Sequence, residues 1–482
     1  MASTETPPPS PPPPPPPVGE ARPAYRDANV LRWLAAYTAS LVGDSVYFVA
    51  LAWSAQKVAG PTEIGLVMAM GALPRAVLML GGGVVADRFG PRRVVLGSDT
   101  VRCLLILTVA AAIALSGPAL WLLIATALVF STVDAVFMPA VGALPPRITD
   151  ADQLARVTGM RSLSIRLSQI AGPPIGGLAM GLGGAAAAFA VAGVLFAVSL
   201  PLLLAVRLRP LEPRDGQPRD GQPRDGQPRD GQPRDGQPRD GQPRDEQPCD
   251  EGQRGEGQQV EGRHVEEQPQ APAGSAWQDI VDGLRHIRRH PLLFPLVLVG
   301  AISELALTGT LNVGMVLLND ERGWGPSGYG FIISAFGAGA AASAALLTFV
   351  GWLPRGGLTM SATLLASCAG AASLALVPGL WAAVAVAAVT GLSAGVFGSL
   401  NNTLVQTETD PAYLGRVTSV VMLTAVGVAP LTYPLVGAAI GAWGATSVFV
   451  GSGAFAAVAV VVALASDAVR RAELPRKSKA QA

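Results

Sequence analysis

The sequence predicts an all-α membrane protein whose twelve transmembrane helices form two pseudo-symmetric six-helix bundles. Half of the 482 residues are hydrophobic and 14% are charged, whereas charged residues make up about a quarter of an average soluble chain. Twelve segments are long and apolar enough to cross a bilayer, which takes about 20 mostly apolar residues. The second half of the chain also repeats features of the first. Together these observations exclude an ordinary soluble enzyme.

Three polar segments flank and divide the predicted bundles. Residues 1–29 begin with a proline run, which favours extended polyproline II and predicts a disordered tail. Residues 208–274 contain PRDGQ repeats, which are neutral and have no large apolar side chain, so we expect a disordered linker. Residues 467–482 form a basic tail. The bundles are therefore predicted at residues 30–207 and 275–466.

Hydropathy places six spans in each predicted bundle. In the first bundle they cover residues 31–56, 62–86, 94–116, 119–141, 157–181 and 184–206. In the second bundle they cover residues 292–318, 327–350, 357–377, 380–405, 416–440 and 444–465. Before the seventh span, the segment from Trp277 to His290 has apolar residues at helical spacing and several arginines, which predicts an interfacial helix.

The distribution of Lys and Arg predicts which side of the membrane each loop faces. An even number of spans puts both termini on one side, and most basic loop residues lie on that side. The short loops on the other side carry only Lys57 and Arg322. Because basic loops stay in the cytoplasm, both termini and the linker are predicted to be cytoplasmic.

A shift of 260 residues superimposes parts of the two halves. The matches run through the fourth and fifth spans of one half and the tenth and eleventh spans of the other. They pair Trp121 with Trp381, Leu154–Thr158 with Leu414–Thr418, and Pro174 with Pro434. Two homologous bundles related by an axis along the membrane normal are the expected result, with a substrate path between them.

Several functional classes lack the residues that they need. None of the three lysines, at 57, 477 and 479, follows a glycine, so there is no P-loop to bind ATP. No HExxH or CxxC pattern occurs, and no arrangement of nucleophile and base stands out, so we expect no metal, no cofactor and no enzymatic activity. A net charge of +1 gives no indication of nucleic-acid binding.

The loop after the second predicted span carries the most specific motif. It reads GVVADRFGPRR, in which glycine permits a tight turn and an acid can accept bonds from helix N-terminal amides. This string resembles the G-x-x-x-D-R-x-G-R-R signature of the major facilitator superfamily, with Pro91 in place of one basic residue. The motif residues are Gly83, Asp87, Arg88, Gly90, Arg92 and Arg93.

Other strings resemble one branch of that superfamily, which holds enterobactin exporters and macrolide efflux pumps. They are Pro139–Ala140, Leu144–Arg147 and Leu154–Arg156. In the fifth span, the residues Gly172, Pro173, Gly176 and Gly177 resemble the antiporter signature, with Ser168 in place of its first glycine. The resemblance implies export. The alternative interpretation of the fifth span is a kink with small-residue packing.

Charged residues inside the spans are concentrated in the first half of the chain. Each costs on the order of 2.5–3.5 kcal/mol at the bilayer centre, so such residues pair or line a path. The interiors of spans eight to twelve contain none. The charged residues are Asp44, Arg75, Asp99, Arg102, Asp134, Arg161 and Arg166 in the first half, and Glu304 in span seven. We expect Asp99, Arg102 and Asp134 to form a structural cluster.

Two of these acids are candidates for transport chemistry. Asp44 is predicted either to exchange Arg75 for a proton, and so couple transport to a gradient, or to form a permanent ion pair with Arg75. Glu304 is predicted either to contact a cationic or polar substrate or to bond to another helix. Tyr47 and Asn312 are further candidates for a central cavity.

These features predict a secondary active transporter that exports a hydrophobic or amphipathic small molecule, such as a drug, antibiotic or secondary metabolite. Proton antiport with alternating access is the expected mechanism. The expected partners are the small-molecule substrate and the lipid bilayer, and the expected form is a monomer in the bacterial inner (cell) membrane. The alternatives are a siderophore exporter or nutrient importer of the same fold, and a non-transporting membrane protein that handles lipid or acts as a sensor.

Overall fold

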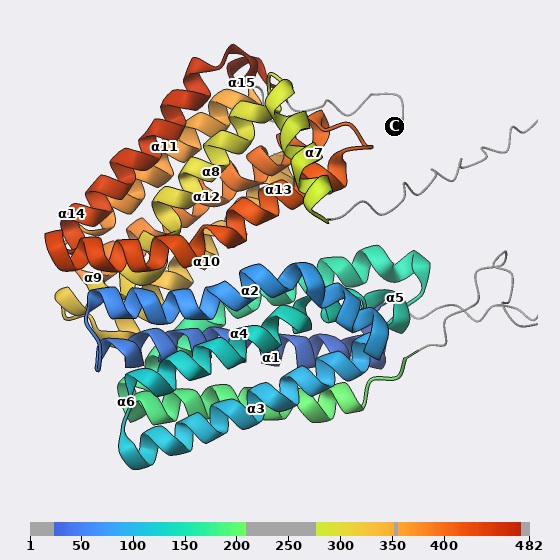
Figure 1. Cartoon of the computed structure of the whole chain (residues 1–482), viewed down its shortest axis with the longest axis vertical. Helices are drawn as coiled ribbons and strands as arrows, with labels where there is room; N and C mark the ends of the chain where they lie inside the picture. The colour runs from blue at the N-terminus through green and yellow to red at the C-terminus, as the bar shows by residue number, and fades with distance from the viewer. Residues whose placement is uncertain (1–23, 209–275, 351–354, 474–482) are drawn as a thin grey trace, which may run out of the picture. The chain divides into compact units, whose positions relative to one another are not determined.

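The computed structural model describes residues 24–208, 276–350 and 355–473, which fold almost entirely into helices (Figure 1). In the first half, Gly184 interrupts α6 with a φ of 71°, so this element contains two spans. The helices of this half are α1 (Ala28–Gln56), α2 (Pro61–Phe89), α3 (Pro91–Ser116), α4 (Leu120–Gly142), the short α5 (Pro145–Ile148) and α6 (Leu154–Leu204).

The second half has the same plan. Gly444 interrupts α14 with a φ of 77°, and a π-helical turn, Thr310–Gly314, joins α8 to α9 within one span. The helices are α7 (Ala276–Arg289), α8 (Leu293–Gly309), α9 (Met315–Glu321), α10 (Gly325–Val350), α11 (Gly356–Leu374), α12 (Leu380–Glu408), α13 (Leu414–Gly427), α14 (Ala429–Ala465) and α15 (Asp467–Arg471).

The predicted architecture of twelve spans is confirmed. Nine helical segments of the described residues are long and apolar enough to cross a membrane, and two of them are pairs of spans joined at Gly184 and Gly444. The remaining span is α2, a helix of 29 residues in which Arg75 is the one charged residue between Glu63 and Asp87. The two interrupting glycines are separated by the same 260 residues that relate the halves in sequence. The structure therefore repeats where the sequence does.

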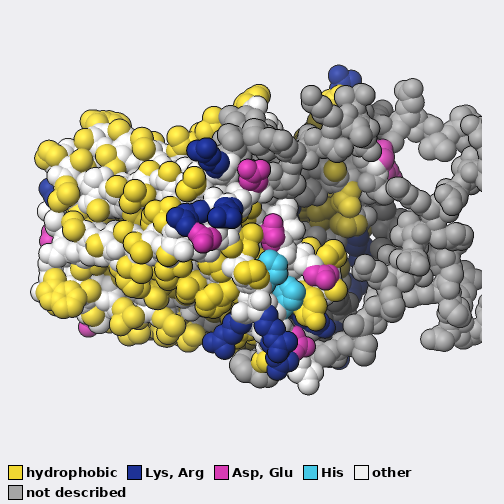
Figure 2. Space-filling model, turned by 90° about the horizontal axis from the view of Figure 1, so that it is seen from above, with side chains coloured by type: hydrophobic (Ala, Val, Ile, Leu, Met, Phe, Trp, Pro, Cys, Tyr) yellow, Lys and Arg dark blue, Asp and Glu magenta, His cyan; other side chains and the backbone are white. Residues whose placement is uncertain are grey.

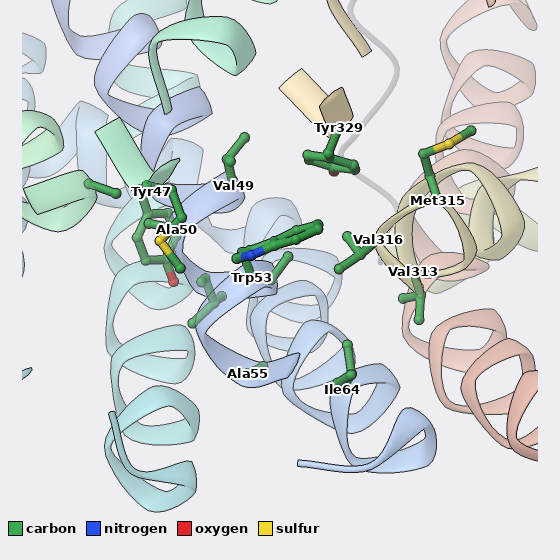
Figure 3. Close-up of a cluster of buried hydrophobic side chains, with 14 of the residues drawn as sticks. Tyr47, Val49, Ala50, Trp53, Ala55, Ile64, Val313, Met315, Val316 and Tyr329 are labelled. Carbon is green, nitrogen blue, oxygen red and sulfur yellow. The ribbon is translucent and has the colours of Figure 1, made fainter. Parts of the chain in front are cut away.

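Three hydrophobic clusters show where the bundles meet. We call the end near Ala28 and Ala465 the tail end, and the end near Gln56 and Gly444 the opposite end. At the tail end each bundle has a core of its own. At the opposite end one core spans both bundles, and Figure 3 shows Trp53 of α1 pointing toward Val316 of α9 and Tyr329 of α10. Hydrophobic packing therefore joins the bundles at the opposite end.

Backbone contacts through glycine join the bundles in two equivalent places. A Cβ atom on any of these four glycines would overlap a backbone carbonyl oxygen of the other bundle. The contacts are Gly177 with Pro326 and Gly330 with Pro173, repeated as Gly437 with Pro61 and Gly65 with Tyr433. Only glycine permits helices to approach this closely.

The outer surface is that of a membrane protein. Figure 2 shows a largely hydrophobic flank, with charged side chains concentrated toward one end and a few at the other. Trp121, Trp381 and Trp443 are 72%, 72% and 71% exposed, all near the opposite end. Exposed tryptophans at one depth are typical of the boundary between lipid and water.

The folded part of each bundle extends beyond the predicted boundaries. Residues from Ala24 onward belong to the fold and not to the predicted tail of residues 1–29, because Ala24 is buried and Asp27 caps α1 by accepting from Asn29 N at 2.8 Å. At the other terminus, Ala472 O accepts from Gly357 N at 3.1 Å, so the start of the predicted tail 467–482 is also folded. The rest of both tails and the linker 209–274 lie outside the described residues.

The predicted interfacial helix is α7. It packs on the start of α13, where Gly283 faces the backbone of Arg416, and His286 stacks on Tyr413 with ring centroids 4.3 Å apart. On α7 itself, Ile287 is buried, whereas Arg288 is exposed. The sequence pattern therefore predicted the helix correctly, while its docking surface became visible only in the structure.

Candidate functional site

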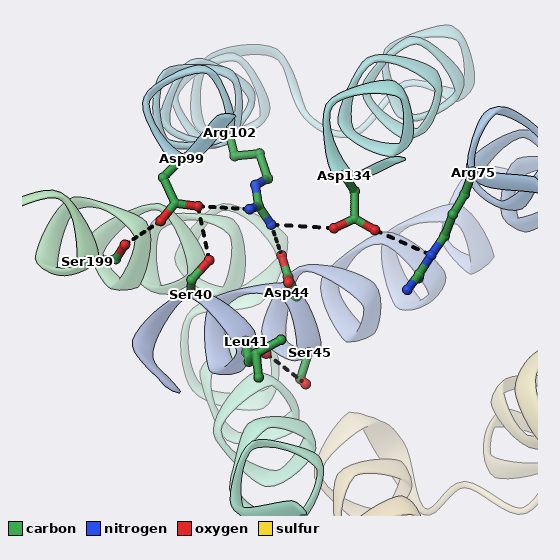
Figure 4. A network of polar contacts seen from close by, with 9 residues as sticks. All are labelled: Ser40, Leu41, Asp44, Ser45, Arg75, Asp99, Arg102, Asp134 and Ser199. Carbon is green, nitrogen blue, oxygen red and sulfur yellow. Dashed lines mark hydrogen bonds and ion pairs between the residues drawn. The ribbon is translucent and has the colours of Figure 1, made fainter. Parts of the chain in front are cut away.

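A cluster of ionisable side chains lies halfway along the first bundle. Asp44, Asp99 and Asp134, on α1, α3 and α4, surround Arg102 of α3 (Figure 4). Along each of these helices, the hydrophobic core of the tail end lies on one side and the shared core of the opposite end on the other. The cluster is thus a polar layer between two apolar layers.

Arg102 is the centre of this layer. Its guanidinium, which is fully buried, donates to Asp44 Oδ1 at 2.8 Å and to Asp99 Oδ1 at 2.8 Å, and lies 3.6 Å from Asp134 Oδ1. The ring of Phe137 lies 3.8 Å from the guanidinium carbon, which adds a cation–π contact. One cation therefore holds three helices together.

Asp99 is the most enclosed of the three acids. Its side chain has no exposed surface, and it accepts from Ser40 Oγ at 3.0 Å and from Ser199 Oγ in addition to Arg102. These hydrogen bonds satisfy a polar group that is fully buried. The predicted structural cluster of Asp99, Arg102 and Asp134 is thus present, and Asp44 belongs to it as well.

Asp44 and Arg75 do not form the ion pair that we predicted as one alternative. Asp44 binds Arg102, and Arg75 Nε lies 3.5 Å from Asp134 Oδ2 instead. Both residues lie halfway along neighbouring spans, but the rotation of α2 directs Arg75 toward α4. A shared depth alone therefore did not identify the partner.

The charges of the layer do not balance if all its groups are ionised. Three carboxylates face two guanidinium groups, those of Arg75 and Arg102. Of the three acids, Asp44 has the most exposed side chain at 13%, against 6% for Asp134 and none for Asp99. Asp44 is therefore the carboxylate at which a proton or another cation could most easily arrive.

The candidates of span seven are exposed and do not belong to a hydrophobic core. Glu304 is exposed, and its Oε2 accepts from Thr308 Oγ1 of the same helix at 2.6 Å. The predicted alternative of a bond to another helix is therefore not what the structure contains. Asn312 is also exposed and donates to Thr308 O at 2.8 Å. Both side chains bond along their own helix and leave polar atoms available to a ligand.

Tyr47 lies in the hydrophobic core and not at an open surface. It is 1% exposed, and its ring stacks on Phe130 with centroids 3.8 Å apart. The prediction that Tyr47 lines a cavity is thus incorrect for this conformation, because α1 turns this face toward α4 and α6. Packing against other aromatic rings is the structural role of Tyr47.

The loop motif joins α2 to α3 at the tail end. Gly90 has a φ of 82°, which glycine adopts without strain, and it precedes α3, which begins at Pro91. Arg92 donates to Leu204 O at 2.9 Å, and Arg88 lies over the ring of Phe89. Arg93 is exposed. Gly83 and the side chain of Asp87 lie outside what the structure describes. The predicted acceptance of bonds from helix N-terminal amides by Asp87 therefore stays a prediction.

The small residues of the fifth span pack on two different helices. Gly172 and Gly176 face α1, at Ser45 and Val46, within the first bundle. Gly177 and the carbonyl of Pro173 face α10 of the second bundle. Small-residue packing thus describes this segment, and half of it lies where the bundles meet.

Sequence reasoning missed the serines that complete the site. Ser40 lies one helical turn before Asp44, and Ser199 comes from the second span of α6. The spacing of Ser40 and Asp44 was a signal that could have been used, whereas no pattern connects Ser199 with α3. Among the described residues, no group of three or more His, Cys, Asp or Glu side chains could hold a metal ion.

The two bundles and the buried ionic layer define the class of this protein, a multi-pass membrane protein with a transporter fold. The sequence model of the Major Facilitator Superfamily matches residues 33–428 and, in a second match, residues 305–482. The chain belongs to this superfamily. A search among curated proteins finds no match at the level of sequence.

Solved structures of transporters have the same fold. A bacterial homolog of the human lysosomal transporter Spinster, in an inward-facing and occupied conformation, is 14% identical with a TM-score of 0.66, covering 95% of this chain and 99% of its own. The nucleoside transporter NupG is 12% identical with a TM-score of 0.63, covering 92% and 100%. The POT family transporter PepTSo is 11% identical with a TM-score of 0.60, covering 91% and 97%. At these identities the likeness establishes the fold alone.

Proposed function

We propose that this protein is a secondary active transporter that exports a hydrophobic or amphipathic small molecule by proton antiport. The tail end then faces the cytoplasm of a bacterial cell, and the opposite end faces outward. In this proposal the two bundles rock about a site near the middle of the membrane. Substrate enters from the tail end and leaves from the opposite end.

The arrangement of the three hydrophobic cores supports alternating access. One core and four glycine contacts join the bundles at the opposite end, whereas each bundle has a separate core at the tail end. With the tail end in the cytoplasm, separate cores at that end are the arrangement expected of an inward-facing state. The outward-open state would require the shared core to separate.

The observation that carries the proposal of proton coupling is the excess carboxylate around Arg102. Asp44 is the most accessible of the three acids and is held by a single guanidinium. Binding a proton at Asp44 would neutralise the excess charge and release its bond to Arg102. A change in these bonds alters the ionic contact between α1 and α3, which links protonation to the state of the first bundle.

Replacing Asp44 with asparagine tests this role. We expect the variant to reach the membrane in normal amount but to lose proton-driven efflux, so that cells accumulate a fluorescent cation such as ethidium to the level of cells lacking the protein. A protonophore should abolish wild-type efflux and have no effect on the variant. The matched control is Glu63→Gln, an exposed acid near the start of α2 outside the layer. Full proton-driven efflux by Asp44→Asn would show that coupling does not use this carboxylate.

The orientation is tested by labelling single cysteines. In a chain whose own three cysteines are replaced, Arg93→Cys at the tail end should be protected from a membrane-impermeant thiol reagent in intact cells, and Lys57→Cys at the opposite end should react. Both should react after the cells are permeabilised. The reverse pattern in intact cells contradicts the proposed direction of transport.

A further inference from the structure

Three polar side chains form one row along span seven. Glu304, Thr308 and Asn312 are four residues apart, so they follow one another on the same side of the helix. Hydrogen bonds join them, because Thr308 Oγ1 donates to Glu304 Oε2 at 2.6 Å and Asn312 Nδ2 donates to Thr308 O at 2.8 Å. Glu304 and Asn312 are exposed. The bonds therefore hold the row in one arrangement and leave its outer atoms open.

This row lies on the side of span seven that meets the first bundle. Val316, four residues beyond Asn312, continues the row and is fully buried. Figure 3 shows Trp53 of the first bundle pointing toward Val316, and both residues belong to the core that the bundles share. α2 of the first bundle also contacts the π-helical turn that contains Asn312. Toward the tail end, where the bundles have separate cores, the row therefore faces the path between them.

Packing contacts set the two ends of the row. At one end, Val316 lies in the shared core. At the other end, Gly300 is one turn before Glu304 and packs on α12, since a Cβ atom on this glycine would lie 3.3 Å from Asn401 Nδ2. The open stretch from Glu304 to Asn312 is about 12 Å long at the helical rise of about 1.5 Å per residue. This length suits one small molecule.

The row presents a negative charge and hydrogen-bond acceptors. Thr308 donates its hydroxyl hydrogen to Glu304, and Asn312 donates an amide hydrogen to Thr308 O, which leaves Glu304 Oε1 and Asn312 Oδ1 as acceptors. Glu304 forms no ion pair within the described part of the chain. A charged side chain near the middle of a span pairs with an opposite charge or lines a path. Leu305, next to Glu304, adds exposed apolar surface.

We propose that Glu304, Thr308 and Asn312 bind the protonated amine of an amphipathic substrate. The ammonium group pairs with the carboxylate of Glu304 and donates to its Oε1, while Thr308 positions this carboxylate. Asn312 Oδ1 accepts from a polar group further along the ligand, and the apolar body of the ligand lies on Leu305. This inference rests on the proposed transport function and narrows its substrate class to amphipathic amines. It places the substrate on a carboxylate of the second bundle, apart from the ionic layer of the first.

Charge complementarity disfavours the other ligand classes. An uncharged ligand of the same shape would cover the carboxylate of Glu304 without pairing it, which costs the solvation of a charge. An acidic ligand would bring a like charge to the same carboxylate, and this repulsion disfavours binding. An ammonium group supplies both the opposite charge and the hydrogens that the acceptors of the row lack.

A matched pair of dyes tests the proposal on the purified full-length protein. One dye is dansylcadaverine, whose primary amine is protonated at neutral pH. The other is its N-acetyl derivative, which has the same ring system and tether but no charge. Fluorescence polarisation should show that the amine binds about tenfold more tightly than the acetylated dye or better, the ratio expected for one charge-assisted pair. Equal binding of the two dyes, tighter binding of the acetylated dye, or binding of neither overturns the proposal.

A variant assigns the preference to Glu304. Glu304→Gln keeps an acceptor for Thr308 and loses the charge, so it should bind both dyes with the affinity that the wild type has for the acetylated one. The matched control is Glu321→Gln, which alters an exposed acid at the end of the same span and should keep the preference. A preference that survives in Glu304→Gln overturns the proposal. Absence of energised dye efflux from cells, with the binding preference intact, would instead refute the proposed export and leave this site standing.

Discussion

Replacing Arg102 with methionine is expected to remove most of the folded protein from the membrane. The substitution leaves Asp44, Asp99 and Asp134 without the cation that they surround. Removing one partner of a buried ion pair costs about 3–5 kcal/mol, which is a large part of the about 5–15 kcal/mol that holds a typical domain folded. Size-exclusion chromatography of a fluorescent fusion should show aggregated or missing protein, and any remaining monomer should melt at a lower temperature.

Two further variants serve as comparisons for Arg102→Met. Arg166→Met removes an arginine from the same bundle at an exposed site and should leave yield and melting temperature near those of the wild type. Arg102→Lys keeps the charge but cannot form the two short bonds to Asp44 and Asp99 together, so it should fall between the other two. A wild-type yield and melting temperature for Arg102→Met would mean that the layer contributes nothing to folding.

Replacing Gly177 with leucine is expected to lower transport several-fold or more while both bundles remain folded. Its Cβ would overlap the carbonyl oxygen of Pro326, so α6 and α10 must move apart at the opposite end. Overpacking a close contact costs about 1–3 kcal/mol, which corresponds to a change of about 5- to 150-fold in the population of the state seen here. Efflux should fall by a similar factor, and Gly437→Leu should act in the same way through Pro61.

The control for this experiment is Gly97→Leu, at a position of α3 where a Cβ meets nothing within 4 Å. It should transport normally. Normal melting temperatures for Gly177→Leu and Gly437→Leu would show that the bundles themselves are intact. Wild-type transport by both of these variants would contradict the conclusion that the glycine contacts belong to the transport cycle.

The number and type of spans could be predicted because they depend on local properties of the chain. A segment of apolar residues of bilayer length must form a helix in lipid, whatever its neighbours are, since its backbone groups have no other partners. The interruptions at Gly184 and Gly444 coincide with the predicted starts of the sixth and twelfth spans. Trp121 and Trp381, which match in sequence, are also equally exposed, and both lie near the opposite end.

The membership of the ionic layer was predicted in part. Asp99 and Arg102 are three residues apart on one helix, so their pairing follows from helical geometry alone. Asp134 was assigned by depth, which proved sufficient because α4 turns it inward. Depth also led to the pairing of Asp44 with Arg75, and there it was misleading. The position of Tyr47 was also predicted wrongly, because the sequence does not indicate which face of α1 packs against α4.

Hydropathy, the internal repeat and the loop motif were enough to establish a membrane protein of two six-helix halves, since each depends only on the order of residues along the chain and not on how the helices pack. The choice of Arg102 as the partner of Asp44, the pairing of Arg75 with Asp134, and the end at which the bundles join depended on the rotation and tilt of whole helices. Those are set by the packing of side chains many residues apart, in which every helix constrains the others. Only the folded molecule contains that information.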